Sequence, residues 1–462
     1  MFEAAIYCHR RDALRRRMGA GLVILVGASE AAINYRDNPY PFVQDGSFAY
    51  LFGLQQPDLI GLIDLDSGEE VLFGADPDLE TRVWMGDLPS LAERGQWAGV
   101  ARTAPRAEVE TWIARATAQG RRLHFPPPYR GRTVLRLAAL TGMAPAAVEA
   151  GASIDLVRAL IALREIKDTG EIAEMERALA TTDRMHRAAM RAARPGVAEF
   201  AVVAALTAEA HRDGLQLAYP AILSRRGEIL HNHDHSQRLA TGDVVINDSG
   251  ASSVMGYASD ITRTIPVGGR FRGRAHALYE TVFAAEAAGI AAVRPGVPFV
   301  DIHKAAMRVL VEGMADFGVF RGDPAEAVET GAYAVVCPGG LGHQIGLDVH
   351  DMESLGEDHV GYGEGFTRST LFGLNRLRLA KPLAADMVVT IEPGLYFIEP
   401  LIEQWAADRR HAGLIDYPRL RALIGAGGLR IEDEVLVTAA GGRVLGPPIP
   451  KTCAEIAEVM EA

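Results

Sequence analysis

The first third of the chain alternates short apolar runs with turn residues. Apolar runs over residues 22–26, 59–65 and 70–73 are each followed by a glycine or by a turn that contains one. Runs of this length between turn residues are typical of strands, and the turn at Ser67 and Gly68 predicts a β-hairpin. Helical patterns cover 11–18 and 108–118. Together these segments predict a small α/β module, in which Pro126-Pro127-Pro128 is interpreted as a stiff internal loop.

From residue 155 onward the pattern changes to long helical stretches. Leu156 and Leu160 recur with helical spacing, and Thr169 is expected to cap the helix that follows. Pro195-Gly196 should end that helix, and another helix is predicted over 199–210.

A short motif then repeats. Pro195-Gly196-Val197 recurs as Pro295-Gly296-Val297, each time between an Ala-rich helix and a further helix, which suggests a duplicated half-domain. Beyond Arg238 the segments rich in Val, Ile and Thr predict strands over 243–247, 261–267, 387–391, 394–398 and 429–437. This second part is therefore expected to be an α+β domain.

Length and charge narrow the choice of function. With 462 residues the chain exceeds one ordinary core and predicts two domains, and its 48% apolar and 23% charged residues are typical of a soluble globular protein. Lys plus Arg number 47 against 59 for Asp plus Glu, a formal charge of -12. This acidic balance argues against a nucleic-acid or anionic-membrane partner.

The cysteines and the apolar runs set the expected compartment. Cys8, Cys337 and Cys453 lie far apart and form no CxxC pair, so neither a disulfide framework nor a thiolate zinc site is expected. No apolar run approaches the length of a membrane span or a signal sequence. We therefore expect a cytoplasmic protein.

Two aspartates flank a predicted hairpin. Asp248 follows the strand pattern over 243–247, and Asp260 precedes the one over 261–267. Paired strands bring side chains to within about 5 Å, where two like charges repel each other unless a cation lies between them. The alternative for each residue taken alone is a solvated acid in a turn.

Further candidates lie in apolar surroundings. His343 and His350 occur in a Gly-rich apolar segment, where a single histidine is more often a hydrogen-bonded core residue. Glu392 and Glu432 interrupt apolar strand patterns, and a buried carboxylate needs a metal, an arginine or a shared proton. Four carboxylates and one imidazole would suit two divalent ions. Such donors favour Mn²⁺ or Co²⁺ over a thiolate-type zinc site. The irregular spacing does not establish such a site by itself.

A family resemblance connects these candidates. The segments DSG, YASDITRT, GHQIGLDVHD, VVTIEPGLYFIEPLI and GGLRIEDEVLVT occur in this order, and NPYPFVQDGSFAYLFG precedes them. In these segments the chain resembles the prolidases (Xaa-Pro dipeptidases), which are pita-bread metallopeptidases related to aminopeptidase P. The resemblance implies a smaller α/β N-terminal domain over 1–155. It also implies a pita-bread catalytic domain of the creatinase/aminopeptidase type over 156–462, an α+β fold.

The resemblance also assigns roles by position. It implies two divalent metal ions, Mn²⁺ first with Co²⁺ and Zn²⁺ as alternatives, a metal-bridging hydroxide as nucleophile, and a homodimer. Arg378 matches a residue that binds the carboxylate of the dipeptide, and Tyr219 a tyrosine near the metals. Glu392 is also the expected proton shuttle. The implied metal ligands are Asp248, Asp260, His343, Glu392 and Glu432, and the other implied catalytic residues are His231, His350 and Arg430.

The sequence departs from the family pattern in three places. One more residue than usual separates Asp248 from Asp260, and a bulge there would change which side chain points inward. Gly339 stands where prolidases commonly have a second histidine. The cluster His231, His233 and His235 contains more histidines than the family motif requires. We interpret them as solvated loop histidines; the alternative is a separate metal site.

Three alternatives to a dipeptidase remain open. They are an aminopeptidase that acts on longer Xaa-Pro peptides, a phosphotriester hydrolase that uses the same metals, and a binding module that has lost catalysis. Arg378 favours the dipeptidase over the aminopeptidase. The intact ligand set opposes the binding module, whereas Gly339 keeps it open.

Overall fold

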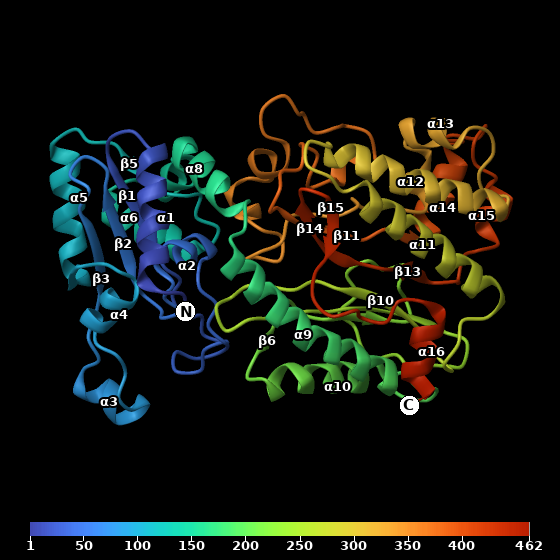
Figure 1. Cartoon of the computed structure of the whole chain (residues 1–462), viewed down its shortest axis with the longest axis horizontal. Helices are drawn as coiled ribbons and strands as arrows, with labels where there is room; N and C mark the ends of the chain where they lie inside the picture. The colour runs from blue at the N-terminus through green and yellow to red at the C-terminus, as the bar shows by residue number, and fades with distance from the viewer. Residues whose placement is uncertain (462) are drawn as a thin grey trace. The chain divides into compact units, whose positions relative to one another are not determined.

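The chain forms two compact units in the computed structural model, which describes residues 1–461 (Figure 1). The first unit comprises Met1–Glu165 together with Met352–Val360. The second comprises Ile166–Asp351 and the described residues from Gly361 onward. The sequence boundary after residue 155 falls at the start of helix α8 (Ile154–Arg164), which belongs wholly to the first unit.

The first unit is built on one five-stranded sheet of order β4-β3-β2-β1-β5. The predicted hairpin is confirmed, because β2 and β3 pair antiparallel with Ile63 opposite Glu70. The predicted helix over 11–18 begins earlier, at Ala4. The strands are β1 (Leu22–Val26), β2 (Ile60–Asp64), β3 (Glu70–Gly74), β4 (Arg102–Pro105) and β5 (Leu123–His124). The helices before α8 are α1 (Ala4–Arg17), α2 (Gly46–Phe52), α3 (Leu79–Met85), α4 (Leu91–Trp97), α5 (Val109–Ala118), α6 (Gly131–Thr141) and α7 (Pro145–Ala150).

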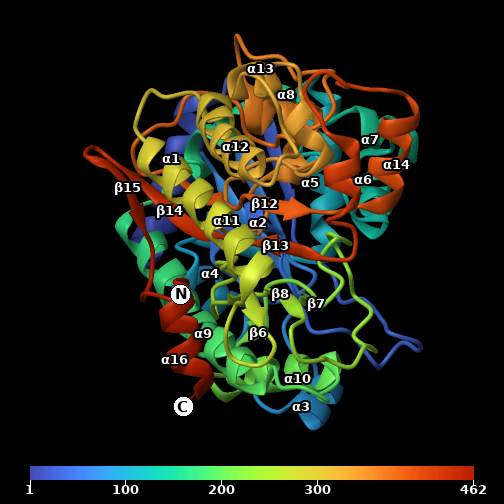
Figure 2. The same cartoon turned by 90° about the vertical axis from the view of Figure 1, so that its right-hand side faces the viewer.

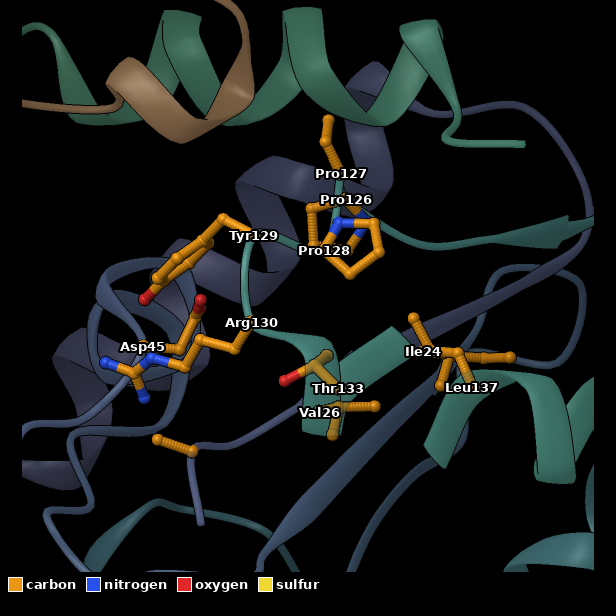
Figure 3. A pocket seen from close by; sticks show the side chains of 11 residues that line it. Ile24, Val26, Asp45, Pro126, Pro127, Pro128, Tyr129, Arg130, Thr133 and Leu137 are labelled. Carbon is orange, nitrogen blue, oxygen red and sulfur yellow. The ribbon is translucent and has the colours of Figure 1, made fainter. Parts of the chain in front are cut away.

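The three consecutive prolines form a loop between β5 and α6, as predicted. They line a small pocket with Ile24 of β1 and Leu137 of α6 (Figure 3). Asp45, the acid in this lining, accepts a hydrogen bond from the backbone N–H of Phe48 and so caps α2. All the residues that line the pocket belong to the first unit.

The second unit contains two pairs of packed helices. The first pair is α9 (Thr169–Ala192) with α10 (Glu199–Arg212), and the second is α11 (Gly273–Ala292) with α12 (Phe299–Asp316) (Figures 1 and 2). Asp168, not the predicted Thr169, caps α9. Its carboxylate accepts from the backbone N–H of Glu171, and the Glu171 carboxylate accepts from the backbone N–H of Asp168. This reciprocal capping box needs a glutamate or glutamine three residues after the cap, and Glu171 stands in that place for Asp168, whereas Ile172 stands there for Thr169.

The repeated Pro-Gly-Val motif forms the same turn in both halves of the second unit, the first of which contains α9 and α10 and the second α11 and α12. The N–H of Gly196 donates to the carbonyl of Leu239 at 2.7 Å, and the N–H of Gly296 donates to that of Leu383, also at 2.7 Å. Both glycines have positive φ, 85° and 84°, which favours glycine at these positions. The shared backbone geometry supports the duplicated half-domain that the motif suggested.

Each half contributes a three-stranded sheet. The first half has the order β10-β8-β7, and the second has β11-β14-β15. Buried apolar side chains such as Met185, Leu206 and Val245, each 0% exposed, fill the space between helices and strands. The strands are β6 (Gln216–Leu217), β7 (Ile222–Ser224), β8 (Val244–Asp248), β9 (Ala251–Ser252), β10 (Thr262–Pro266), β11 (Val388–Ile391), β12 (Gly394–Tyr396), β13 (Gly428–Arg430), β14 (Asp433–Thr438) and β15 (Gly441–Val444). The remaining helices are α13 (Pro324–Glu329), α14 (Glu399–Ala407), α15 (Tyr417–Arg421) and α16 (Cys453–Glu461).

The single strand predicted over 429–437 is wrong. It is two strands, because β13 pairs with β12 whereas β14 pairs with β11. Glu432 lies in the break between them, where its N–H donates to the carbonyl of Thr262 at 3.0 Å. The break thus connects the sheet of the second half to that of the first.

The structure around Asp248 has a regular register. β8 and β10 pair antiparallel without a bulge, from Asp248 opposite Thr262 to Val244 opposite Pro266. The extra residue before Asp260 is therefore accommodated outside the paired strands. Within residues 1–461 no helix has both the length and the apolar character needed to cross a membrane.

A buried histidine holds the end of β8 against α9. His186 is 0% exposed, its Nδ1 lies 3.0 Å from Asn247 Nδ2, and its Nε2 lies 3.1 Å from the carbonyl of Ser249. These partners require a hydrogen on Nε2 and a lone pair on Nδ1, so the ring is neutral. Burial and the charge of Arg263 lower the pKa of His186 to about 3. The residues on both sides of Asp248 are thus fixed by one imidazole.

This histidine predicts acid sensitivity. In the unfolded chain His186 takes up a proton below about pH 6.5, whereas the folded chain resists protonation to about pH 3, so stability is lost as the pH falls through this window. The contribution approaches about 1.4 kcal/mol per pH unit well below pH 6.5. His186→Gln should lower the thermal midpoint at pH 7.5 but lose less additional stability between pH 6.5 and 5. Thermal unfolding of metal-free protein measures both.

The exposed His211, replaced in the same way, is the control and should leave the midpoint and its pH dependence close to those of the original protein. An unchanged pH slope in His186→Gln would contradict this account.

Candidate active site

Three predicted ligands meet in the interior of the second unit. Asp260, His343 and Glu432 are all buried, and one potential ligand atom from each lies within 4.8 Å of those of the other two. His343 Nε2 lies 3.4 Å from Asp260 Oδ2 and 3.7 Å from Glu392 Oε1. Asp260 comes from the first half of the unit, and the other three come from the second.

Tyr219 brings Asp248 into the same group. Its hydroxyl lies 2.6 Å from Asp248 Oδ1 and 2.5 Å from Asp260 Oδ1. A phenol has one proton, so it donates to one of these carboxylates at a time. Burial and the surrounding carboxylates raise the pKa of Tyr219 well above its usual value, which keeps the phenol protonated. The structure thus places all five predicted ligands in one connected cluster.

Arg430 lies on the other side of Asp248. Its Nη2 donates to Asp248 Oδ2, its Nη1 lies 2.9 Å from the Tyr396 hydroxyl, and its Nε donates to Thr262 Oγ1 at 3.0 Å. Thr262 Oγ1 in turn donates to Glu432 Oε2 at 2.7 Å. A single buried guanidinium therefore orients one carboxylate directly and a second one through a threonine.

The histidines are oriented for ligation. His343 Nδ1 lies 2.9 Å from the carbonyl of Gln344, which can only accept, so Nδ1 carries a hydrogen and Nε2 faces the acids. Burial acts to lower the pKa of His343, but Asp260 and Glu392 outweigh it and raise that pKa, so a metal would have to displace a proton from Nε2. His350 is half-buried and packs edge-on against the ring of His343, with ring centroids 4.4 Å apart. The backbone N–H of His343 also donates to Thr390 Oγ1 at 3.1 Å, which fixes the segment to β11.

The electrostatics of the cluster show a shortage of positive charge. Burial and the neighbouring carboxylates raise the pKa of Glu432 well above its usual value. Burial and Asp260 raise the pKa of Asp248 to about 7 in spite of Arg430. Burial also acts to raise the pKa of Asp260, but hydrogen bonds from His343 and Tyr219 outweigh it and hold that pKa below its usual value.

These residues fit a divalent metal centre. Glu432 Oε1 is buried and has no hydrogen-bond partner within residues 1–461, although such an atom is costly to leave unpaired. Carboxylate oxygens with one imidazole nitrogen are the donors that Mn²⁺, Co²⁺ and Zn²⁺ accept. A cation among them would satisfy Glu432 and offset the repulsion that raises the pKa values of Glu432 and Asp248.

The other predicted residues lie around this centre. His231 is exposed, and partial desolvation together with the positive charges of Arg430 and Arg378 lowers its pKa. Arg378 is half-buried. His233 is exposed and His235 Nδ1 bonds to the carbonyl of Leu223 at 3.0 Å, so neither joins a metal-ligating group in the described part of the chain.

Gly339 leaves an open position. A Cβ built there meets nothing within 4 Å. Gly339 thus replaces the histidine of the family pattern, and no side chain of the described residues occupies the space beside it.

Sequence reasoning missed two supporting side chains. Thr262 was not identified, although it lies two residues after Asp260. Glu434 is 0% exposed, and its Oε1 accepts the backbone N–H of Asp260 at 2.8 Å. Burial raises the pKa of Glu434 well above its usual value. Its position two residues after Glu432 is the signal that would have found it.

A separate ion-pair network fixes the backbone of Glu432. Arg263, 1% exposed, donates to the carbonyl of Glu432 at 2.7 Å and to Asp433 Oδ1 at 2.7 Å. Lys451 Nζ lies 2.5 Å from Asp433 Oδ2 and 2.7 Å from Glu286 Oε1. The network therefore links the candidate metal centre to α11 and to the segment before α16.

Comparisons with known proteins agree on one family. The sequence model for "Metallopeptidase family M24" matches residues 173–439, and that for "Aminopeptidase P, N-terminal domain" matches residues 7–124. The chain is similar to the Xaa-Pro dipeptidase of Homo sapiens, at 29% identity over 95% of this chain and 88% of that protein. It is also similar to the Xaa-Pro aminopeptidase of Escherichia coli (strain K12), at 28% identity over 98% of this chain and 97% of that one.

Solved structures extend the similarity to the whole fold. The aminopeptidase PepP of Pseudomonas aeruginosa aligns with a TM-score of 0.80 at 28% identity, and zinc-substituted E. coli aminopeptidase P with product aligns with a TM-score of 0.81 at 26%. Both alignments cover 100% of this chain and 98% of the other.

The raised pKa of Asp248 predicts how metal uptake depends on pH. In the metal-free protein this carboxyl holds a proton below about pH 7, and a cation must displace it. The apparent affinity for Mn²⁺ should therefore fall by about tenfold per pH unit below pH 7. Titration of the free Mn²⁺ signal by electron paramagnetic resonance measures this affinity.

The variant Asp248→Asn removes the titrating group. It should bind Mn²⁺ more weakly at pH 8 and show a shallower dependence on pH. Affinity for Mn²⁺ that is constant between pH 8 and 6 in the unaltered protein would contradict the prediction.

Proposed function

Because the chain belongs to metallopeptidase family M24 and has the aminopeptidase P fold, we propose that it hydrolyses the Xaa-Pro bond of dipeptides with two divalent metal ions. One observation carries the proposal. Among residues 1–461 the buried Glu432 Oε1 has no hydrogen-bond partner, and it lies close to Asp260 and to His343, whose Nε2 faces the carboxylates; a metal centre needs such a group of donors.

The proposed ligands provide mainly oxygen donors. Such a set favours Mn²⁺, with Co²⁺ and Zn²⁺ as alternatives. Two bound cations would supply Lewis acidity at the scissile carbonyl and make water a stronger acid. The ligands are Asp248, Asp260, His343, Glu392 and Glu432.

Glu392 is suited to proton transfer. Its side chain retains 24% exposure, whereas that of His343, 3.7 Å away, retains 5%. It is therefore accessible to a substrate as well as to the metal centre. The prolyl nitrogen must be protonated to leave, and Glu392 carries that proton. His231 and His350 donate hydrogen bonds to the carbonyl oxygen as negative charge develops on it.

Arg378 provides a site for the substrate carboxylate. Burial, the charge of Arg430 and the charge of Arg378 together lower the pKa of the His231 ring. A guanidinium pairs with a carboxylate through two parallel hydrogen bonds. In a dipeptide that carboxylate is on the proline itself, next to the scissile bond, so Arg378 favours dipeptides over longer peptides.

The closest competing function is an Xaa-Pro aminopeptidase. It uses the same metals, and both a dipeptidase and an aminopeptidase are among the relatives at almost equal identity. Phosphotriester hydrolysis would use the same metals as well. The complete carboxylate cluster argues against a binding module. A homodimer in the cytoplasm stays a prediction.

Peptide cleavage tests the proposal. Protein stripped of metal and reconstituted with Mn²⁺ should release proline from Ala-Pro, and chelator should abolish the release. Glu392→Gln should reduce kcat by about 10²-fold or more, since it removes both the proton carrier and one ligand charge. Glu399→Gln, the same change at an exposed glutamate of α14, serves as the control. Absence of cleavage at saturating Mn²⁺ would overturn the assignment.

Arg378 separates dipeptidase from aminopeptidase. Arg378→Ala should raise KM for Ala-Pro by about tenfold or more through loss of a charge-assisted contact, and should change cleavage of Ala-Pro amide much less. Steady-state kinetics on both substrates measure the difference. Equal turnover of Ala-Pro and Ala-Pro-Ala by the unaltered enzyme would favour the aminopeptidase.

A further inference from the structure

A second group of potential metal ligands lies on the outside of the second unit. His276 and Glu280 are exposed on α11, and the half-buried Cys453 is the first residue of α16. Cys453 Sγ donates to Glu280 Oε1 at 3.1 Å, and His276 Nε2 lies 3.8 Å from the same oxygen. One ligand atom from each residue lies within 4.8 Å of the other two.

The distances of 3.1 and 3.8 Å to Glu280 Oε1 are close to those between neighbouring donor atoms of a tetrahedral zinc site. Zinc bonds of about 2.0–2.3 Å place neighbouring donor atoms roughly 3.3–3.7 Å apart. We propose that His276, Glu280 and Cys453 form a second metal site that binds Zn²⁺ through nitrogen, oxygen and sulfur, with the fourth position open to water. As the sulfur–zinc bond forms, the thiol proton leaves to solvent.

The thiol is what distinguishes this group from an ordinary surface pair. Histidine and glutamate four residues apart are common neighbours on an exposed helix face. A thiolate between them adds the ligand for which Zn²⁺ has a strong preference. Burial and Glu280 raise the pKa of the Cys453 thiol to about 12, because a thiolate and a carboxylate in contact repel each other unless a cation is present.

The backbone of Cys453 is positioned before any metal binds. The Tyr279 hydroxyl donates to the carbonyl of Lys451 at 2.6 Å, and Lys451 Nζ donates to Glu286, so the segment before α16 is attached to α11 at two points. Thr452 then caps α16 by accepting the N–H of Glu455 at 3.2 Å. Little chain entropy remains to be lost when the three ligands close around an ion.

The sequence predicted no thiolate zinc site because its cysteines are isolated. Our proposal departs from this expectation, since the fold brings Cys453 to a histidine and a glutamate more than 170 residues earlier in the chain. The proposed ion would join α11 to α16, and it is independent of the peptidase function.

Cobalt provides a selective probe. The full-length protein is first saturated with Mn²⁺ and then titrated with Co²⁺. The catalytic ligands contain no sulfur, so a thiolate-to-Co²⁺ charge-transfer band in the near ultraviolet reports the second site alone. We expect one equivalent of Co²⁺ to produce the band and Zn²⁺ to remove it.

Matched cysteine variants identify the ligand. Cys453→Ser should abolish the band, whereas Cys8→Ser, at a half-buried cysteine of the first unit, should leave it intact. A band that survives Cys453→Ser, or no band at saturating Co²⁺, would overturn the proposal. Thermal midpoints of the metal-free variants verify that each one folds.

The histidine provides a second test that keeps the thiol. His276→Ala changes an exposed side chain and should weaken Co²⁺ binding, measured by the same band, by about tenfold or more. Zn²⁺ should also raise the thermal midpoint of the Mn²⁺-saturated protein but not that of Cys453→Ser. Unchanged affinity in His276→Ala would contradict the proposed ligand set.

Discussion

The organisation of the second unit depends on the repulsion between carboxylates that are buried side by side. Asp248, Asp260 and Glu432 lie together where water cannot screen them, and such a group is unstable without compensating donors and positive charge. Arg430 supplies one cation, and Tyr219 supplies a hydrogen bond. In the proposed metal centre, the residual deficit would be the source of the affinity for metal, because a site that was neutral without an ion would gain little from binding one.

The duplicated half-domain explains how these acids come together. The first half contributes Asp248 and Asp260 from a hairpin, and the second contributes Glu392 and Glu432 from the ends of its strands. The bridge between Thr262 and Glu432 joins the two sheets at this point. The proposed ligands come from both halves, so metal binding would stabilise the same state as the packing of the halves against each other.

Much of this could be predicted from local patterns. The hairpins, the helices after residue 155 and the repeated turn follow from turn chemistry and periodicity, and the family resemblance and the α+β fold are confirmed. The strand break before Glu432 could not be predicted, because it depends on a hydrogen bond to Thr262 from the other half. Glu434 and the pairing of Cys453 with α11 were missed for the same reason: their partners are distant in sequence. The assignment of the five ligands stays a prediction.

Asp248 was the least secure of those ligands, since an extra loop residue follows it. Three contacts on separate elements now bear on its orientation. His186 of α9 holds both of its neighbours, Arg430 of β13 pairs with one carboxylate oxygen, and Tyr219 bonds to the other. A shift of register would break all three at once, whereas a longer loop between β8 and β10 costs only a small closure entropy. The added residue is therefore accommodated in the loop, and the carboxylate keeps its inward direction.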